Sequence, residues 1–158
     1  MAEKMAGHLR LNDEECTDLI LLAKLHDVGK VGVSDSILFK DGPLSDEEYE
    51  KMKRHSEIGC KIAVRNKELM HISDLILHHH ESWDGSGYPS GLRGENIPKE
   101  CRILAILDAY DAMTNKRPYR DAMSKEKAVE ELKRSSAAQF DPVILSAFLG
   151  MIQKTAGV

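Results

Sequence analysis

Two apolar segments of this chain end in histidines, and this feature constrains the fold more than any other. Residues 13–27 carry apolar side chains at helical spacing behind an acidic start, and they end in His26-Asp27. A second apolar segment ends in the run His78-His79-His80-Glu81. Imidazoles and carboxylates bind borderline divalent metals, and one carboxylate can bridge two of them. Helices that carry such groups at their ends are therefore expected to meet at one metal centre.

The rest of the chain is also typical of helices. Ser45 followed by Glu48 is a capping-box pattern that opens a helix. The apolar residues 99–113 predict a buried helix, Ser124 caps another, and Pro142 suits the first turn of the last one. Residues 82–98 are rich in glycine and proline and predict a long loop. We expect one all-α domain over residues 1–158, a bundle of about six to seven helices.

Composition excludes several classes. The chain has 158 residues, 42% apolar and 30% charged, with a net charge of −4, so it offers no general attraction to nucleic acid. No apolar run approaches the roughly 20 residues of a membrane segment, and residues 1–12 lack a signal-peptide core. The three cysteines are scattered and form no CxxC, which disfavours a disulfide framework and favours a cytoplasmic location.

Six residues are candidate metal ligands, namely His26, Asp27, His55, His79, His80 and Asp108. Asp108 lies inside an apolar helical run, where a carboxylate is costly to bury unless it is paired or coordinated. Taken singly, each histidine is better read as a satisfied core residue, but six such groups together favour a two-metal hydrolytic centre. Neighbouring side chains on a helix point about 100° apart. We therefore do not expect His78 to join His79 and His80, nor any special role for His71.

The sequence resembles the HD superfamily of metal-dependent phosphohydrolases, and specifically its HD-GYP branch. His26-Asp27-Val28-Gly29-Lys30 is similar to the HDxGK motif, and residues 79–89 are similar to the HHExxDGxGYP signature. Residues 108–114, 117–120 and 139–142 resemble later blocks of the family, so the likeness covers about residues 13–150. It implies an HD-type helical bundle whose Gly/Pro-rich segment is the GYP loop.

The resemblance implies hydrolysis of cyclic di-GMP to pGpG, with GMP as the alternative end product, by a metal-activated water. Matching positions imply that His26, Asp27 and Asp108 serve one metal and that His55, His79 and His80 serve the other, with Asp27 bridging. Iron or manganese is favoured, and nickel, zinc or magnesium stays open. Lys30 is expected to contact the scissile phosphate and, with Asp27, to act in catalysis.

Four further residues are singled out around the loop. Arg117 and Arg120 match family positions that hold phosphate, the alternative being exposed loop arginines. Tyr88 is expected either to stack on guanine or to pin the loop. Glu81 is expected to orient a ligating histidine, and Asp84 either does the same or caps a turn.

One departure concerns the start of the chain. Family members carry a further ligand histidine about thirty residues before the HD pair, a position before residue 1 here, and His8 is not expected to replace it. We therefore expect a domain cut within or after its first helix, with exposed apolar surface that favours a homodimer. The resemblance implies a sensor or receiver domain in the parent chain and cyclase domains as partners. Alternatives are another HD-type nucleotide phosphohydrolase and a catalytically impaired module that binds cyclic di-GMP or a signalling domain.

Overall fold

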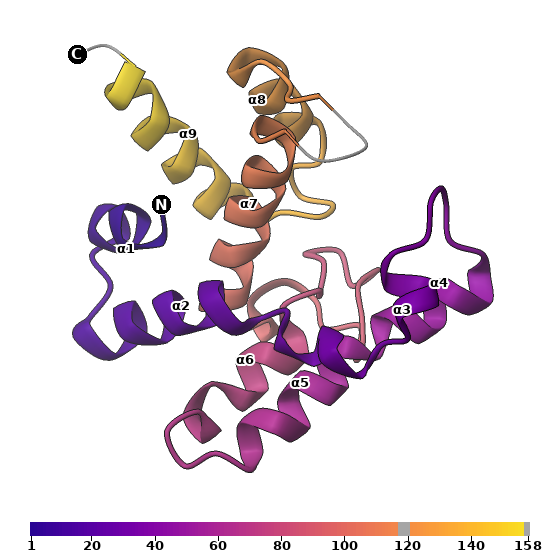
Figure 1. Ribbon diagram of the computed structural model, residues 1–158. Helices are drawn as coiled ribbons and strands as arrows, with labels where there is room; N and C mark the ends of the chain where they lie inside the picture. The colour runs from indigo at the N-terminus through magenta and orange to yellow at the C-terminus, as the bar shows by residue number, and fades with distance from the viewer. Residues whose placement is uncertain (117–120, 157–158) are drawn as a thin grey trace.

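The computed structural model describes residues 1–116 and 121–156, with side chains up to residue 153. Within these residues it contains helices only, together with one isolated bridge between Ser136 and Phe140 (Figure 1). In chain order the elements are α1 (Ala2–Leu9), α2 (Asp13–Leu25), η1 (Val28–Gly32), α3 (Asp35–Leu38), α4 (Asp46–Lys53), α5 (His55–Val64), η2 (Met70–Ile72), α6 (Ser73–His78), η3 (Gly94–Asn96), α7 (Lys99–Thr114), α8 (Lys125–Arg134) and α9 (Pro142–Ala156).

The helices surround two apolar cores that share α2 and α7. The first core joins α1, α7, α8 and α9 through residues such as Met5, Tyr110 and Phe148, and Figure 1 shows these helices grouped around the upper part of α7. The second core joins α2, α5, α6 and the lower part of α7 through residues such as Leu22 and Ile76. Because α2 and α7 take part in both cores, the C-terminal ends of α2 and α6 lie near the middle of α7.

The helix boundaries agree with the sequence signals. Ser45 accepts a hydrogen bond from the backbone N–H of Glu48, and the Glu48 carboxylate accepts one from the Ser45 backbone in return. Ser124 likewise accepts from the N–H of Lys127, and α9 begins at Pro142. Because these signals act within one turn, sequence alone predicts them.

The all-α class is confirmed, and the described residues contain nine α-helices and three 3₁₀ helices, more than the predicted six to seven. The additional elements are short. Helix α3 has four residues, too few for a periodic pattern to stand out, whereas α6 is the predicted helix that ends in the histidine run. Helix α1 precedes the first predicted helix and packs on α2 and α9, with Met5 buried.

The backbones of η1 and α5 approach each other closely, and this contact positions Asp27 relative to His55. A Cβ atom built on Gly29 would lie 1.9 Å from the carbonyl oxygen of His55 and 2.4 Å from the backbone nitrogen of Gly59. Only a glycine leaves room for this contact. Asp27 therefore comes to lie beside His55.

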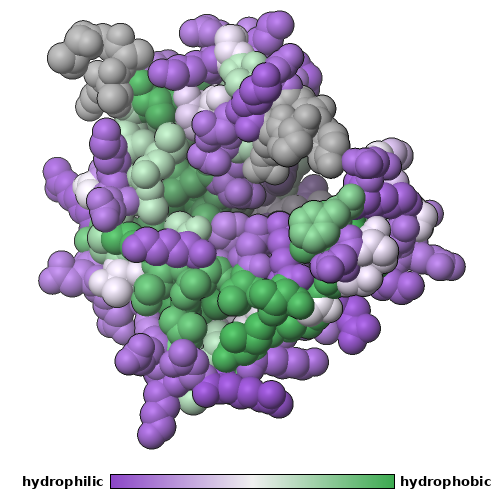
Figure 2. All heavy atoms as spheres, in the orientation of Figure 1, coloured by the Kyte–Doolittle hydropathy of each residue, from purple (hydrophilic) through white to green (hydrophobic). Residues whose placement is uncertain are grey.

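Apolar side chains are also exposed outside the cores. Figure 2 shows a patch of hydrophobic residues on the displayed face, where the C-terminal end of α2, η1 and α5 lie in Figure 1. Val31 in η1 and Val64 in α5 are exposed as well. Among the described residues, no helix is both long enough and apolar enough to cross a membrane.

Candidate metal centre

Three histidines are aimed by the last turn of the helix that precedes each of them. The Nδ1 atoms of His55 and His79 each lie 2.7 Å from the carbonyl oxygen three residues earlier, and Nδ1 of His26 lies 3.2 Å from such a carbonyl. A carbonyl can only accept, so Nδ1 of each ring carries the proton. In the neutral ring this tautomer leaves the lone pair on Nε2, the form in which imidazole binds a metal.

The Nε2 lone pairs converge on one point. Nε2 of His55 lies 3.3 Å from Nε2 of His79 and 3.2 Å from Nε2 of His80. Asp27 joins them, and one ligand atom from each of the four residues lies within 4.8 Å of all the others. Since His55 and His79 face each other with lone pairs at this distance, a shared cation is the group that satisfies both. This donor set fits a divalent metal.

The two carboxylate oxygens of Asp27 face different histidines. Oδ1 lies 3.6 Å from Nε2 of His55, and Oδ2 lies 3.6 Å from Nε2 of His26 and 2.7 Å from Nζ of Lys30. Burial raises the pKa of the Asp27 carboxyl, but the hydrogen bond and charge of Lys30 and the two histidines outweigh it and lower the pKa below its usual value. Asp27 is therefore ionised at neutral pH.

The histidines of the cluster are neutral at the same pH. Burial, followed by the neighbouring His80, lowers the pKa of His79 to about 2. Burial, followed by His55, lowers the pKa of His80 to about 4, and burial also lowers the pKa of His55. No proton has to leave these rings before a metal binds.

This neutrality makes acid stability a test of the site. The pKa values of His79 and His80 are far below the unfolded value of 6.5, so the unfolded state binds more protons below that pH. The metal-free protein should keep its stability above about pH 6.5 and lose about 1.4 kcal/mol per pH unit per histidine as the pH falls towards 4. Urea unfolding with a chelator at pH 7 and pH 5 measures this, and a His80→Gln variant should show a shallower dependence. Equal unfolding free energies at both pH values would contradict it.

Asp108 and His26 extend the cluster on one side. Together with His79 and His80 they line a cavity of about 170 Å³ between the end of α6 and the middle of α7. The ring of His26 is 5.3 Å from that of His79, edge to face. The structure thus brings all six predicted ligands to one region, four of them in direct convergence and two around the adjoining cavity.

A larger cavity of about 540 Å³ lies on the other side of the cluster. His55 and His80 form its inner wall, and Lys30 and Tyr88 line it as well. The Tyr88 ring packs on His80 with centroids 4.9 Å apart, and burial raises the pKa of its hydroxyl. These contacts favour the loop-pinning interpretation of Tyr88.

Of the two acidic residues at the loop, Glu81 differs from expectation, whereas Asp84 takes the turn-capping role that was one of its two predicted alternatives. Glu81 was expected to orient a ligating histidine. Instead its carboxylate accepts hydrogen bonds from the backbone N–H groups of Ser90 and Leu92, and it lies 3.3 Å from Nδ1 of His78, outside the cluster. Asp84 caps a turn by accepting from the N–H of Ser86. The reason is that the loop turns back towards the end of α6, where the buried Glu81 carboxylate requires donors and finds them in the loop's N–H groups.

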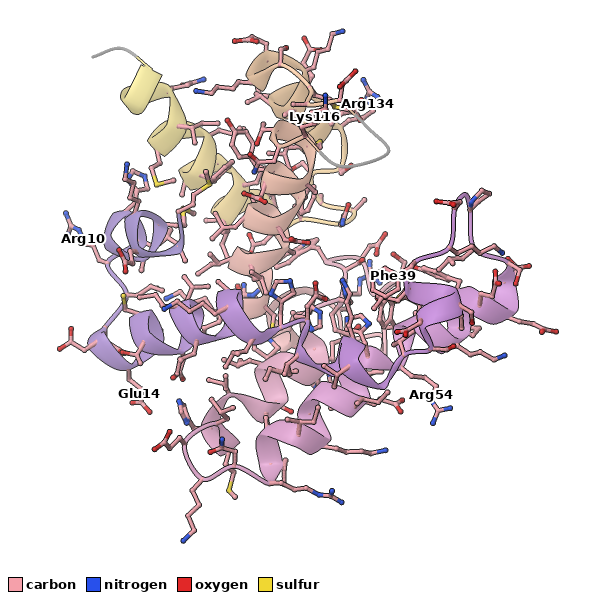
Figure 3. The ribbon with its side chains drawn as sticks, in the orientation of Figure 1. Arg10, Glu14, Phe39, Arg54, Lys116 and Arg134 are labelled. Atoms are coloured by element: carbon pink, nitrogen blue, oxygen red, sulfur yellow. The ribbon has the colours of Figure 1, made fainter. Side chains whose placement is uncertain are left out.

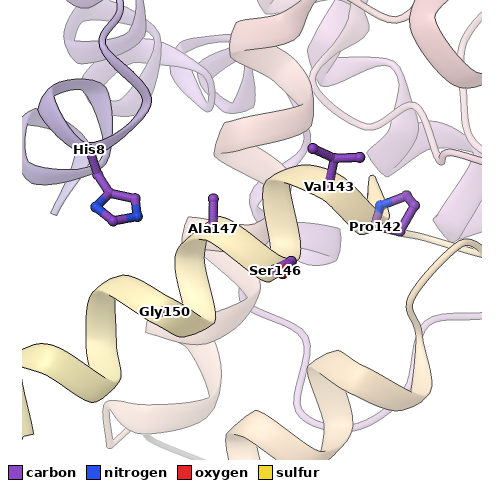
Figure 4. A pocket seen from close by; sticks show the side chains of 6 residues that line it. All are labelled: His8, Pro142, Val143, Ser146, Ala147 and Gly150. Atoms are coloured by element: carbon purple, nitrogen blue, oxygen red, sulfur yellow. The ribbon is translucent and has the colours of Figure 1, made fainter.

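The remaining histidines lie elsewhere. His78 contacts Glu81 and Asp74, and His71 pairs with Asp18 at 3.3 Å. His8 projects from α1 towards α9 and lines an open hollow of about 550 Å³ there, remote from the cluster residues (Figure 4). Arg117 and Arg120 lie outside the described residues.

Two residues that sequence reasoning gave no role line the large cavity. Tyr49 comes from α4, and its place in an exposed, charged helix carried no signal. Gln139 precedes α9 and lines both cavities. Its position in a family-like block was the available signal, but a block match does not say which of its side chains reaches the site.

Comparisons with known proteins identify the family to which the chain belongs. A family model described as HD domain matches residues 1–144. A cyclic di-GMP phosphodiesterase of Thermotoga maritima is 37% identical over 160 residues, covering 100% of this chain and 44% of that protein. The cyclic di-GMP phosphodiesterase response regulator RpfG of Xanthomonas campestris pv. campestris is 40% identical over 151 residues, covering 94% of this chain and 40% of that protein.

A solved structure shares the fold. The cyclic GMP-AMP specific phosphodiesterase V-cGAP3 of V. cholerae superposes with a TM-score of 0.73 at 22% identity, covering 99% of this chain and 42% of that one. This chain thus spans less than half the length of these three relatives. The match of the family model over residues 1–144 and the resemblance to the HD-GYP branch together establish that the chain belongs to the HD domain family.

Proposed function

We propose that this chain is a metal-dependent phosphodiesterase that hydrolyses cyclic di-GMP to pGpG, with GMP as the further product to be tested. The observation that carries the proposal is the convergence of Asp27, His55, His79 and His80 within 4.8 Å at the inner wall of a cavity that Lys30 lines. A cation site beside a cavity with a positive side chain is suited to an anionic phosphodiester. The names of the relatives support the cyclic dinucleotide as substrate class.

We assign the residues to two divalent metal ions, with iron or manganese favoured over nickel, zinc or magnesium. His55, His79 and His80 would hold one ion, His26 and Asp108 the other, and Asp27 both. The two oxygens of Asp27, which face His26 and His55 respectively, support this division. When bound, such ions lower the pKa of a water and neutralise developing charge on the phosphate.

The chain's own residues would complete the chemistry. Asp27, whose pKa is lowered by Lys30, stays ionised and balances the charge of the centre. The Lys30 side chain is 38% exposed beside Asp27, whose own side chain is 41% exposed, so its ammonium group can turn towards a phosphate oxygen without breaking a fully buried contact. The buried Nδ1–H bonds of His55 and His79 hold the imidazoles in place. Arg117 and Arg120 are proposed to hold the distal phosphate.

Incubation with cyclic di-GMP and Mn²⁺ or Fe²⁺, followed by product chromatography, tests the proposal. We expect pGpG to accumulate with time, and the appearance of GMP as a second product would not affect the proposal. No product should form in the presence of a chelator or with the Asp27→Asn variant. Parallel reactions with 3',3'-cGAMP address the substrate named for another relative, a 3'3'-cGAMP-specific phosphodiesterase of Vibrio cholerae that is 40% identical over 149 residues. If the unsubstituted chain binds cyclic di-GMP without turnover, the alternative of a catalytically impaired binding module is favoured. Turnover of mononucleotides alone would favour another HD-type phosphohydrolase.

The partners follow from the same family. A sensor or receiver domain in the parent chain is proposed on the analogy of the relative named as a response regulator. Cyclase domains and a homodimer are further proposals, and sedimentation of the purified chain tests the homodimer.

A further inference from the structure

The two cavities beside the metal cluster share a wall. His80, Ser82 and Gln139 line both the 170 Å³ cavity that contains Asp108 and the 540 Å³ cavity that contains Lys30. A ligand in the larger cavity therefore lies directly next to the cluster. Its volume is within the range of about 300–1,000 Å³ that is common for small-molecule sites.

The larger cavity is lined by both apolar and polar residues. Leu38, Met52 and Tyr49 supply apolar surface, whereas Ser82, Ser86 and Gln139 supply polar groups. A purine base has the matching form, with two apolar faces and hydrogen-bonding edges. The proposed function leaves this cavity without a role beyond the phosphate contact of Lys30.

Tyr49 is the aromatic ring of this cavity that has surface to spare. The Tyr88 ring is packed against His80 at 4.9 Å, and the Lys53 ammonium lies 5.5 Å from its centroid. Tyr49 has the same ammonium 5.4 Å from its centroid, but it is 50% exposed. A base can therefore stack on Tyr49 without displacing a packed histidine.

Gln139 is suited to read the edge of the base. Its backbone carbonyl accepts a hydrogen bond from the N–H of Trp83, and the neighbouring Ala138 carbonyl accepts from Asp84. The backbone is thus anchored to the loop. Gln139 lines both cavities and is itself exposed, and its carboxamide offers both donor and acceptor groups.

We propose that the larger cavity is a purine-binding subsite, in which Tyr49 stacks on the base and Gln139 hydrogen-bonds its edge. This inference rests on the proposed function, which places the phosphodiester of the substrate at the metal cluster and so leaves the larger cavity for the base. It does not require turnover, because a base can bind there whether or not the phosphodiester is cleaved.

Calorimetric titration of the Mn²⁺-loaded chain with GMP and with ribose 5-phosphate tests this directly. The two ligands share a phosphate and a ribose, and only GMP has a base. We expect GMP to bind about tenfold more tightly, since stacking of one base on an aromatic ring commonly accounts for that much. Tyr49→Ala should abolish the difference and Gln139→Ala should reduce it, whereas Tyr49→Phe should retain it.

Phe39→Ala is a matched control. Phe39 ends α3, is 71% exposed and does not line the cavity, and Figure 3 places it at the α3–α4 end of the molecule. This variant should keep the full preference for GMP. Equal affinity of the parent for the two ligands, or a preference that survives Tyr49→Ala, would overturn the proposal. Failure of the proposed function would look different: the unsubstituted chain would prefer GMP over ribose 5-phosphate but would not hydrolyse cyclic di-GMP.

Discussion

His79→Ala is expected to reduce turnover of cyclic di-GMP by more than about 100-fold, since groups that only orient a metal ligand already account for about 10–100-fold. His79 is buried at the centre of the cluster, and its ring contacts those of His26, His55 and His80. Its loss removes one Nε2 ligand and leaves the facing lone pair of His55 without a shared cation. Metal content should fall together with the rate.

Steady-state rates, elemental analysis and circular dichroism on the same preparations separate a chemical loss from a folding loss. His71→Ala is the control, because His71 is exposed and pairs only with Asp18 among the described residues. It should keep the parental rate and metal content. His79→Gln, which fills more of the volume, should be as inactive as His79→Ala. A rate for either His79 variant close to that of the parent would refute the ligand assignment.

Gly29→Ala is expected to lower the free energy of unfolding by about 3 kcal/mol and to disrupt the metal centre as well. The new methyl group would lie 1.9 Å from the His55 carbonyl oxygen, so η1 and α5 must separate. Asp27 precedes η1 and His55 begins α5. Their separation would therefore pull two of the four converging groups apart.

Urea unfolding of Gly29→Ala and Gly7→Ala provides the measurement and its control. A Cβ on Gly7 meets no atom within 4 Å, and alanine is the better helix former in α1, so Gly7→Ala should be neutral or stabilising by up to about 1 kcal/mol. Similar unfolding midpoints for the two variants would show that the η1–α5 contact can relax. Position 29 would then not require a glycine.

Local sequence signals were sufficient for much of the fold. The capping residues Ser45 and Ser124 and the apolar period of residues 99–113 each predicted a helix that the structure contains. These signals depend on groups within one or two turns of each other. Helix α6, expected from its apolar residues before the histidine run, is also present. Helix α3 was harder to predict because a segment of four residues does not complete a recognisable period.

The roles of loop residues could not be predicted in the same way. The sequence placed Glu81 next to two histidines along the chain, yet its carboxylate binds the N–H groups of Ser90 and Leu92, which are nine and eleven residues further on. Gln139 lies 41 residues beyond residue 98, where the loop ends, but shares a cavity wall with His80. Such contacts depend on how the loop folds over α6, and no local pattern encodes that path.

By itself the sequence determined that this chain is a helical domain with histidines and aspartates at the helix ends, because residue types and short-range spacing decide both. Only the tertiary structure decided that Asp27, His55, His79 and His80 meet within 4.8 Å and that Glu81 does not join them. The physical reason is packing. The two apolar cores and the close contact at Gly29 fix where helix ends far apart in the chain come together.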